Sequence, residues 1–287
     1  DTVGGQILFL NEKVRTASGT KYGTFDNLQT VLIEGSSALD VDDGVTLKGV
    51  DNILTSVDKL FMQSTSASFV GFDFGSAISQ TIEINDPILI GPAGSIGLTG
   101  LASSGNVPAG VAATVTGGNF SGVDVALDTI SVDDIRWFFS GNSGIPDTRK
   151  DSLISIFGST TQTVISSVNT PVKANGAWSL EGSSQFTADT TGRITYDGEV
   201  DLRVPIDFST TLKTATGSDK QVTLYIAVNG VIIPQTGKEG TVSSTKPASI
   251  TGIWQHTFKN GDYVEIWLEN NDDTTNIILQ QAVGRVN

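Results

Sequence analysis

The clearest pattern of polar and apolar positions lies in Gln221–Gln235, with the sequence QVTLYIAVNGVIIPQ. Apolar residues alternate and run up to Val228, the dipeptide Asn229-Gly230 follows, and a second apolar run begins at once. A type I′ turn needs positive φ at both central residues, which Asn and Gly adopt at little cost. The stretch therefore predicts a tight β-hairpin.

The rest of the C-terminal half repeats this design. Short apolar runs recur about every 10–12 residues between turn-forming residues, a spacing typical of a sandwich or jelly roll. The pattern predicts strands at Gly176–Leu180, Ser184–Thr187, Arg193–Tyr196, Glu199–Phe208, Val222–Val228, Val231–Gln235, Ile250–Phe258, Asp262–Glu269 and Asn276–Val283.

The N-terminal half also predicts short strands. Its first apolar piece, Ile7–Leu10, is expected to form an opening strand or an extended arm, with a loosely ordered terminus as the alternative. Further strands are expected at Thr30–Glu34, Val45–Lys48, Ser68–Phe74, Gln80–Asn85, Ile88–Ile90, Ala112–Thr116, Val123–Leu127 and Leu153–Phe157. The predicted fold class is all-β, with an N-terminal β-rich region followed by a C-terminal antiparallel jelly-roll sandwich.

Two segments of the N-terminal half resemble each other at an offset of 73 to 75 residues. The offset equals about three turns of a β-solenoid with 20–25 residues per turn, in which Gly and Asn would occupy the corners. A solenoid is therefore one interpretation of this region. The matching pieces are Gly49-Val50-Asp51, Ser56-Val57-Asp58 and Leu60-Phe61, against Gly122-Val123-Asp124, Ser131-Val132-Asp133 and Trp137-Phe138.

Two stretches also fit short helices. Between Val50 and Met62, apolar residues fall at the i, i+3, i+4 and i+7 spacing of a helical stripe. Ser131 with Asp134 resembles a capping box that would open a helix through Phe139. Helix is expected in these two places only.

Two further segments bear on domain organisation. Gly91–Gly110 is the most glycine-rich stretch and is expected to form a surface excursion or a loop between subunits. Gly158–Pro171 is polar, uncharged and ends in proline, as linkers often do. It places the predicted division between a β-rich anchoring or shaft region, residues 1–160, and a jelly roll, residues 161–287.

The amino-acid composition limits the classes of binding partner that are expected. The 287 residues include 31 acidic and 17 basic residues, for a net charge of −14 without a basic stripe, so nucleic acid is not an expected partner. Apolar runs stay well short of the roughly 20 residues of a membrane span, so a membrane is not expected either. The chain has no cysteine, which excludes disulfides and thiolate metal sites.

Three C-terminal segments carry a resemblance to a known family. They are Phe186–Gly198, with G-x-I-x-Y at Gly192–Tyr196; the hairpin Val222–Ile233; and Phe258–Leu268, with N-G-D-x-V at Asn260–Val264. Residues 165–287 thereby resemble the TNF/C1q-like jelly-roll domains that trimerise, especially those that end phage virion proteins. The resemblance implies a fibre- or spike-type virion protein of a tailed phage, with the N-terminal half similar to a β-rich shaft.

Candidate catalytic residues are few. His256 is the only histidine, and a Ser-His-Asp triad would have to use it, but the chain has no G-x-S-x-G elbow. A surface or interface position is the alternative for His256. Glu83, Asp86, Asp133 and Asp134 would suit a glycosidase if the fold held two of them about 5–10 Å apart in a groove. Solvated positions are the alternative for these acids.

Two acidic loops resemble calcium sites. Asp40–Gly44 fails the EF-hand pattern, because positions six and twelve are Val45 and Asp51. In Asn270–Asp273, Asp272 and Asp273 offer oxygen ligands for calcium, with a solvated turn as the alternative.

Aromatic residues raise the question of sugar binding. Trp137, Phe138 and Phe139 are consecutive, so on a strand they cannot all face one core. Trp267 differs in parity from the apolar residues around it and is the best candidate for an exposed or interfacial ring. Other aromatic residues of the C-terminal half are Trp178, Trp254 and Tyr263.

We expect a non-enzymatic structural virion protein, namely a phage fibre, spike or capsid-attached appendage, with no catalytic, metal or cofactor-binding residues. Its expected partners are two further copies in a homotrimer, other virion proteins and a host-surface glycan. Apolar runs such as Val231–Ile233 and Ile277–Leu279 need cover on both strand faces, which a trimer would supply. The glycan would contact loops Thr236–Lys246 and Asn270–Thr275. The alternatives are a carbohydrate-active β-helical depolymerase and a lectin-like adhesin.

Overall fold

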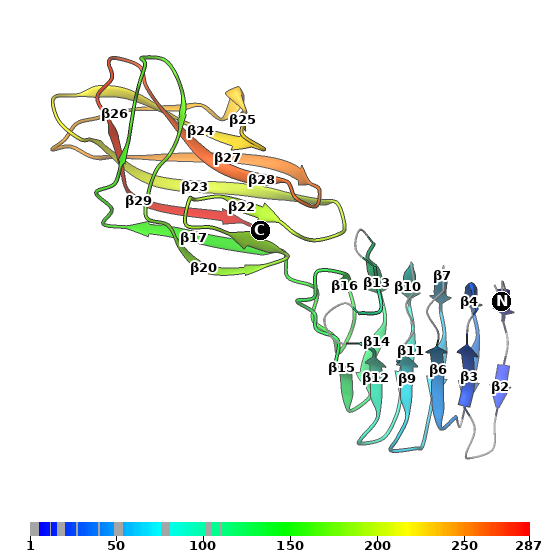
Figure 1. Ribbon diagram of the computed structural model, residues 1–287. Helices are drawn as coiled ribbons and strands as arrows, with labels where there is room; N and C mark the ends of the chain where they lie inside the picture. The colour runs from blue at the N-terminus through cyan, green and yellow to red at the C-terminus, as the bar shows by residue number, and fades with distance from the viewer. Residues whose placement is uncertain are drawn as a thin grey trace. The chain divides into compact units, whose positions relative to one another are not determined.

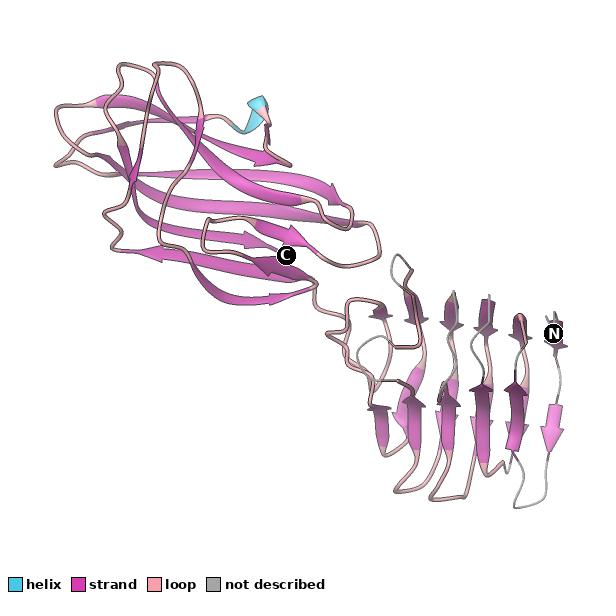
Figure 2. Cartoon of the chain, in the orientation of Figure 1, coloured by secondary structure: helices cyan, strands magenta, loops and turns pink. Residues whose placement is uncertain are grey.

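The structure, a computed structural model, describes residues 6–11, 13–15, 21–26, 28–39, 41–48, 54–75, 81–101, 105–108 and 111–287. Contacts divide the chain into two compact units, Asp1–Arg149 and Lys150–Asn287, called the solenoid and the sandwich below (Figure 1). Figure 2 shows strands throughout the described part, with one short 3₁₀ helix, η1 (Pro234–Thr236). The predicted all-β fold class is confirmed.

Each turn of the solenoid adds one strand to each of three parallel sheets. Their orders are β1-β4-β7-β10-β13-β16, β2-β5-β8-β11-β14 and β3-β6-β9-β12-β15. The strands are β1 (Gln6–Leu10), β2 (Lys13–Arg15), β3 (Lys21–Asp26), β4 (Thr30–Glu34), β5 (Ser37–Leu39), β6 (Asp43–Lys48), β7 (Leu54–Asp58), β8 (Phe61–Gln63), β9 (Val70–Asp73), β10 (Ile82–Asn85), β11 (Ile88–Ile90), β12 (Ile96–Thr99), β13 (Ala113–Thr116), β14 (Asn119–Gly122), β15 (Val125–Asp128) and β16 (Trp137–Ser140).

Register sets the length of a turn. Paired residues lie between 22 positions apart, as in Lys21 with Asp43, and 32 apart, as in Ile90 with Gly122. Because the strands are parallel and in register, the side chains of paired residues stack inward from turn to turn. One such stack is Ile33, Val57, Ile84, Val115 and Phe139, each at most 1% exposed.

A column of left-handed residues marks one corner of the solenoid. Each follows directly after a strand of the first parallel sheet and has a φ between 50° and 68°. Each of the first five also donates its backbone N–H to a carbonyl of the next turn, at 2.8 to 3.1 Å. Gly and Asn were expected at corners, and the column adds a Lys and an Asp: Asn11, Gly35, Lys59, Asp86, Gly117 and Gly141.

Both helix predictions are wrong. In the described part of Val50–Met62, the apolar spacing arises from two strands, β7 and β8, joined at the Lys59 corner, with Leu60 buried beside it. Ser131–Arg136 forms two tight turns, and β16 begins directly after them at Trp137. Ser131 Oγ accepts from the Asp133 N–H at 3.1 Å, and Asp134 Oδ1 accepts from the Arg136 N–H at 2.9 Å. Side-chain acceptors of this kind stabilise turns as well as helix starts.

The sequence match between the two N-terminal segments does not coincide with the structural repeat. Ser56–Asp58 lies in β7, whereas Ser131–Asp133 lies in a turn. Successive turns of the solenoid share the alternation of buried and exposed side chains rather than identical residues.

The glycine-rich stretch is also part of the solenoid, not a surface excursion as a whole. Gly91–Gly110 contains β12, which pairs with β9 and β15. Gly97 is buried in β12, where a Cβ atom would lie 2.6 Å from the Ala126 carbonyl oxygen. Glycine is needed there because the backbones approach closely.

The sandwich consists of two antiparallel sheets. The first has the order β20-β17-β29-β23-β27 with β18 beside β29, and the second has the order β21-β22-β28-β24-β25 with β19 beside β28 and β26 beside β24. The strands are β17 (Asp151–Phe157), β18 (Gln162–Thr163), β19 (Val172–Lys173), β20 (Ser179–Ser184), β21 (Phe186–Ala188), β22 (Ile194–Tyr196), β23 (Leu202–Thr214), β24 (Lys220–Val228), β25 (Val231–Ile232), β26 (Lys238–Val242), β27 (Ala248–Phe258), β28 (Tyr263–Asn270) and β29 (Ile277–Val286).

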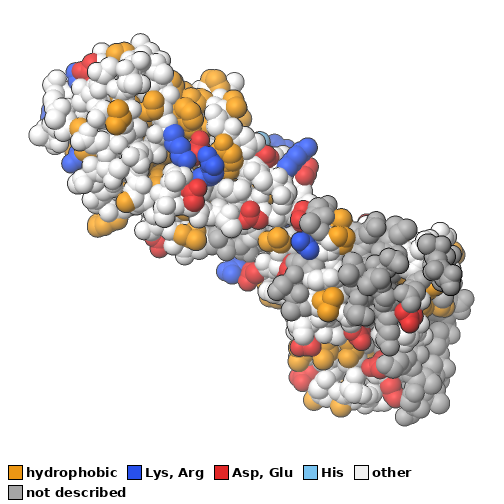
Figure 3. Space-filling model, in the orientation of Figure 1, with side chains coloured by type: hydrophobic (Ala, Val, Ile, Leu, Met, Phe, Trp, Pro, Cys, Tyr) orange, Lys and Arg blue, Asp and Glu red, His pale blue; other side chains and the backbone are white. Residues whose placement is uncertain are grey.

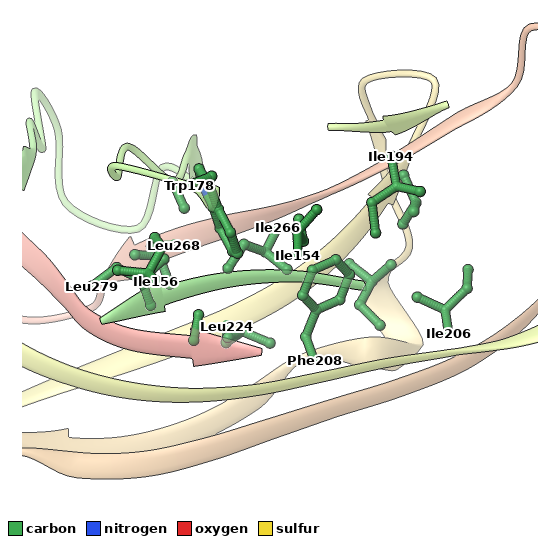
Figure 4. Close-up of a cluster of buried hydrophobic side chains, with 14 of the residues drawn as sticks. Ile154, Ile156, Trp178, Ile194, Ile206, Phe208, Leu224, Ile266, Leu268 and Leu279 are labelled. Atoms are coloured by element: carbon green, nitrogen blue, oxygen red, sulfur yellow. The ribbon is translucent and has the colours of Figure 1, made fainter. Parts of the chain in front are cut away.

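The predicted hairpin joins β24 to β25. Val228 pairs with Val231, and Asn229 and Gly230 have φ of 52° and 74°, as a type I′ turn requires. The core between the sheets includes Ile206, Phe208 and Leu224, which Figure 4 shows among the buried side chains. Tyr196, the last residue of G-x-I-x-Y, packs on Phe186 and donates its hydroxyl to the Val200 carbonyl.

The division between the units lies between residues 149 and 150, whereas the sequence placed it after residue 160. The segment Asp151–Phe157 forms β17, which pairs with β29 and β20 and so belongs to the sandwich. Part of the expected linker, Gln162–Thr163, is β18.

Candidate functional site

Two basic side chains meet over one buried carboxylate on the outer face of the second sheet. Along β28, Val264, Ile266 and Leu268 belong to the core, so Glu265 points away from it. The Glu265 side chain is nevertheless only 3% exposed, with its Oε2 atom 2.7 Å from Lys173 Nζ and 3.5 Å from Arg193 Nε. A buried carboxylate is tolerated when cations and donors compensate its lost hydration.

Two aromatic rings complete this cluster. Trp267 donates its Nε1–H to Glu265 Oε1 at 3.1 Å. The Arg193 guanidinium lies 3.8 Å from the centroid of the Tyr263 ring, in cation–π geometry. Glu265 and Tyr263 together therefore fix the orientation of Arg193.

The loop between β21 and β22 holds the cluster from one side. Asp189 Oδ1 accepts from the Thr191 N–H at 2.8 Å, the Thr191 hydroxyl at 2.7 Å and the Arg193 N–H at 3.2 Å. Burial acts to raise the pKa of Asp189, but these hydrogen bonds and the charge of Lys173 lower it below its usual value. Lys173 in turn donates to Thr191 Oγ1 at 3.0 Å.

Gly192 lets this loop pack closely. Its φ of 82° is left-handed, and an added Cβ would overlap the indole of the buried Trp178. The glycine of G-x-I-x-Y is thus required by backbone conformation and by contact, and it sets the position of Arg193.

These side chains border an open hollow of about 560 Å³, lined by Lys173, Ala174, Asn175, Asp189, Thr191 and Arg193. Its volume falls in the range of ligand sites, about 300–1,000 Å³. Lys173 and Arg193 stay 29% and 36% exposed at its rim. The hollow can therefore offer cationic donors to a ligand while the opposing carboxylate stays buried.

Sequence reasoning did not identify this pocket. One signal was present, because the alternation of Asp262–Glu269 places Glu265 on the solvent side of its strand. Lys173 carried no signal, since its approach to Glu265 depends on the pairing of β19 with β28 across more than 90 residues of chain.

The outer face of the first sheet carries a second feature, a set of exposed apolar side chains. Leu153 and Phe157 on β17, Ile253 on β27 and Val283 on β29 are 37%, 88%, 61% and 48% exposed. Leu153 and Val283 line a hollow of about 330 Å³ together with Asp207, Ser209, Thr251 and Arg285. Figure 3 shows exposed hydrophobic side chains, in orange, on the visible face of the sandwich.

His256 lies on β27 with its Nε2 atom 3.6 Å from Asp262 Oδ2 and its ring edge-to-face on Phe258. Asp262 is already used by the neighbouring turns, since it accepts from Asn229 Nδ2 at 2.7 Å and from the Lys259 N–H at 2.8 Å. Burial acts to raise the pKa of Asp262, but these bonds and the charge of His256 lower it below its usual value. The pair stabilises two turns.

The acidic loop Asn270–Thr275 is held by internal bonds. Asp273 Oδ2 lies 2.8 Å from Lys220 Nζ, and Asp273 Oδ1 accepts from the Thr275 N–H at 2.8 Å. The Lys220 hydrogen bond and charge, with the bonds from Thr275, hold the pKa of Asp273 well below its usual value. Asp272 Oδ2 accepts from the Gln221 N–H at 2.8 Å. Across the described residues, no three His, Asp or Glu side chains gather as metal ligands would.

The other predicted acids lie on separate parts of the solenoid. Glu83 is exposed on β10, and Asp86 is the corner residue after that strand. Asp133 lies in the first of the two turns before β16, 3.6 Å from Arg149, and Asp134 caps the second. Of the Asp40–Gly44 loop, Asp40 lies outside the described residues and Asp43 begins β6.

The aromatic residues divide by parity. Trp137 and Phe139 are buried in the solenoid, whereas Phe138 between them is half-buried on the outer side. Trp178 is buried in the sandwich, and Trp254 and Trp267 are half-buried. Trp267 does point away from the core, as its parity predicted, and it contacts Glu265.

One of the two loops expected to contact a receptor is partly a strand. Thr236–Lys246 contains β26, which pairs with β24 from Lys220↔Val242 to Leu224↔Lys238. Ile277–Leu279 also needs no partner, since all three side chains are buried within the sandwich.

No helix in the described part is long and apolar enough to span a membrane.

No protein-family model and no curated protein matches the chain. Solved structures similar to the chain include the globular domain of zebrafish complement 1qA, with 13% identity, 48% of this chain and 96% of that chain covered, and a TM-score of 0.30. Eiger TNF from S. frugiperda has 15% identity, with 48% of this chain and 92% of that chain covered and a TM-score of 0.32. Murine APRIL has 11% identity, with 48% of this chain and 98% of that chain covered and a TM-score of 0.32. The jelly-roll assignment rests on the strand pairing, and these similarities carry no information about function.

Proposed function

We propose that the chain is a non-enzymatic structural virion protein, a fibre, spike or capsid-attached appendage of a tailed phage, that assembles as a homotrimer through its sandwich. The motifs within Phe186–Leu268 motivate the virion setting by resemblance. The observation that carries assembly is the outer face of the first sheet, where Leu153, Phe157, Ile253 and Val283 are exposed in the single chain.

Exposed apolar side chains on neighbouring strands favour association, because burial between copies removes them from water. Rotational symmetry lets one face of each copy meet a face of the next without leaving an open end. The solenoid suits the part of a stalk or anchor, since stacked parallel turns form a rod-like unit from neighbour contacts alone.

Light scattering on the purified chain tests assembly. A mass near three times 30.1 kDa is expected at micromolar concentration. The double variant Ile253→Asp, Val283→Asp should be monomeric with an unchanged β-type circular dichroism spectrum, because it buries charge in the proposed interface. Ile88→Asp is the matched control, since Ile88 is 41% exposed on β11 of the solenoid and should leave a trimer that forms through the sandwich intact. A wild-type monomer would contradict the proposal.

Imaging of phage particles that lack the gene tests the virion role. Loss of a fibre, spike or appendage is expected. Particles that keep every appendage and infect normally would refute the assignment, whereas loss of an appendage with normal adsorption would retain the structural role and remove receptor binding.

A further inference from the structure

We infer that the hollow between Lys173 and Arg193 binds a sugar unit that carries one carboxylate. This inference gives a chemical class to the host-surface partner of the proposed function, and it rests on that proposal for its biological setting alone. The binding itself follows from the groups that line the hollow.

The cationic side of the hollow suits one anionic group. Lys173 uses its ammonium group on Glu265 and Thr191, which leaves one of its three N–H donors. Arg193 approaches Glu265 through Nε, and no hydrogen bond between described residues uses its two terminal nitrogens. A planar guanidinium fork with a neighbouring ammonium matches the two oxygens of a carboxylate.

The remaining groups suit hydroxyls. The three hydrogen bonds to Asp189 all end on Oδ1, so Oδ2 remains as an acceptor. Asn175 donates through Nδ2 to the Gln162 carbonyl at 3.3 Å, so its Oδ1 also remains. Acceptors beside the cations disfavour a small anion such as phosphate, because it offers at most two hydroxyl donors and the acceptors repel its charge. A ligand with one carboxylate and several hydroxyl donors satisfies both sides.

The hollow is preorganised for this ligand. Glu265 and Tyr263 hold Arg193, and the Asp189 hydrogen bonds and Gly192 hold the loop that carries it. A ligand therefore orders few side chains on binding, which lowers the entropic cost of association.

Calorimetric titration of the full chain at pH 7 tests the inference, with glucuronate, glucose and inorganic phosphate as probes. Glucuronate is expected to bind at least about tenfold more tightly than glucose, the difference expected for charge-assisted hydrogen bonds. Phosphate is expected to bind more weakly than glucuronate. Glucose or phosphate binding as tight as glucuronate, or no binding of any probe at about 10 mM, would overturn the inference.

Variants locate the site. Arg193→Gln should weaken glucuronate binding by about tenfold or more, and Arg193→Lys should weaken it less, because the charge remains and the fork is lost. Arg285→Gln is the matched control: Arg285 also pairs with an aspartate, Asp207 at 3.3 Å, but lies on the other sheet. Equal losses in Arg193→Gln and Arg285→Gln would contradict the site.

Two further measurements separate this inference from folding defects and from the proposed function. Asn175→Ala changes an exposed side chain and should weaken both glucuronate and glucose without lowering the melting temperature. Light scattering on the same samples reports assembly independently. A monomer that binds glucuronate would support the pocket and contradict the trimer, whereas a trimer that binds no probe would contradict the pocket alone.

Discussion

The solenoid and the sandwich differ in how far apart along the chain their paired strands lie. In the solenoid, each strand pairs with the strand one turn away, 22 to 32 residues along the chain, as Gln6 pairs with Thr30. In the sandwich, Ser152 of β17 pairs with Val286 of β29, so the first strand closes on the last. Solenoid turns therefore depend on their neighbours, whereas sandwich strands depend on the whole unit.

The largest effect that separates the two units is expected from Phe208→Ala. Phe208 is fully buried between the sheets and contacts Gly284, so the cavity should cost about 3–5 kcal/mol of the free energy of unfolding. Hydrogen exchange should show lost protection across all strands of the sandwich together, with the solenoid unchanged. Losses confined to β23 and its neighbours would contradict a single cooperative unit.

A smaller and more local effect is expected from Ile84→Ala. Ile84 is buried in β10 between Val57 and Val115, and truncation should cost about 2–5 kcal/mol locally. Protection should fall in β7, β10 and β13 and remain in β1 and β16, because coupling passes only between adjacent turns. Uniform loss along the whole solenoid would contradict the comparison.

The corner column allows a test of backbone conformation alone. Gly141 has φ of 67°, and the nearest atom to an added Cβ is 4.0 Å away, so Gly141→Ala should cost about 1–2 kcal/mol through the left-handed conformation. Gly182→Ala in the sandwich is the matched control, because its Cβ would also meet open space and its φ is not left-handed. Thermal unfolding should show destabilisation for the first variant only; equal effects would count against the role of the corner.

Acid should weaken the sandwich through Asp262. The pKa of this carboxyl is lowered, so it stabilises the folded state above the unfolded value of about 3.9 and loses that contribution as the pH falls through its folded value. The melting temperature of the sandwich should therefore drop below about pH 4, and Asp262→Asn should reduce both stability at pH 7 and the steepness of the acid drop. An unchanged acid profile in Asp262→Asn would exclude this carboxyl as a cause.

Local patterns predicted much of the fold. The Asn229-Gly230 hairpin and the strands Thr30–Glu34 and Ile88–Ile90 were predictable because turn residues and alternation are local properties. The false helix at Val50–Met62 came from the same kind of pattern. Its described part bends at Lys59, which is in the left-handed region and donates its N–H to the Asn85 carbonyl of the neighbouring turn, a contact that the local sequence does not reveal.

The candidate site was less predictable. G-x-I-x-Y drew attention to Gly192–Tyr196, and alternation placed Glu265 on the outer face. The convergence of Lys173, Arg193 and Glu265 depends on three strands brought together from positions far apart in the chain. Pairing of that kind leaves no mark in a single sequence, since each residue alone is an ordinary surface charge.

The corner column of the solenoid also makes its length adjustable in whole steps. The interval from Gly35 to Asp58 contains one complete turn of 24 residues, including its corner residue and its inward side chains. Repeating or deleting such an interval keeps every later residue on its original face and changes the height of the stack by one strand spacing, about 4.8 Å. Evolution or protein engineering can therefore change the length of the solenoid in steps of one turn, without changing the sequence at either end.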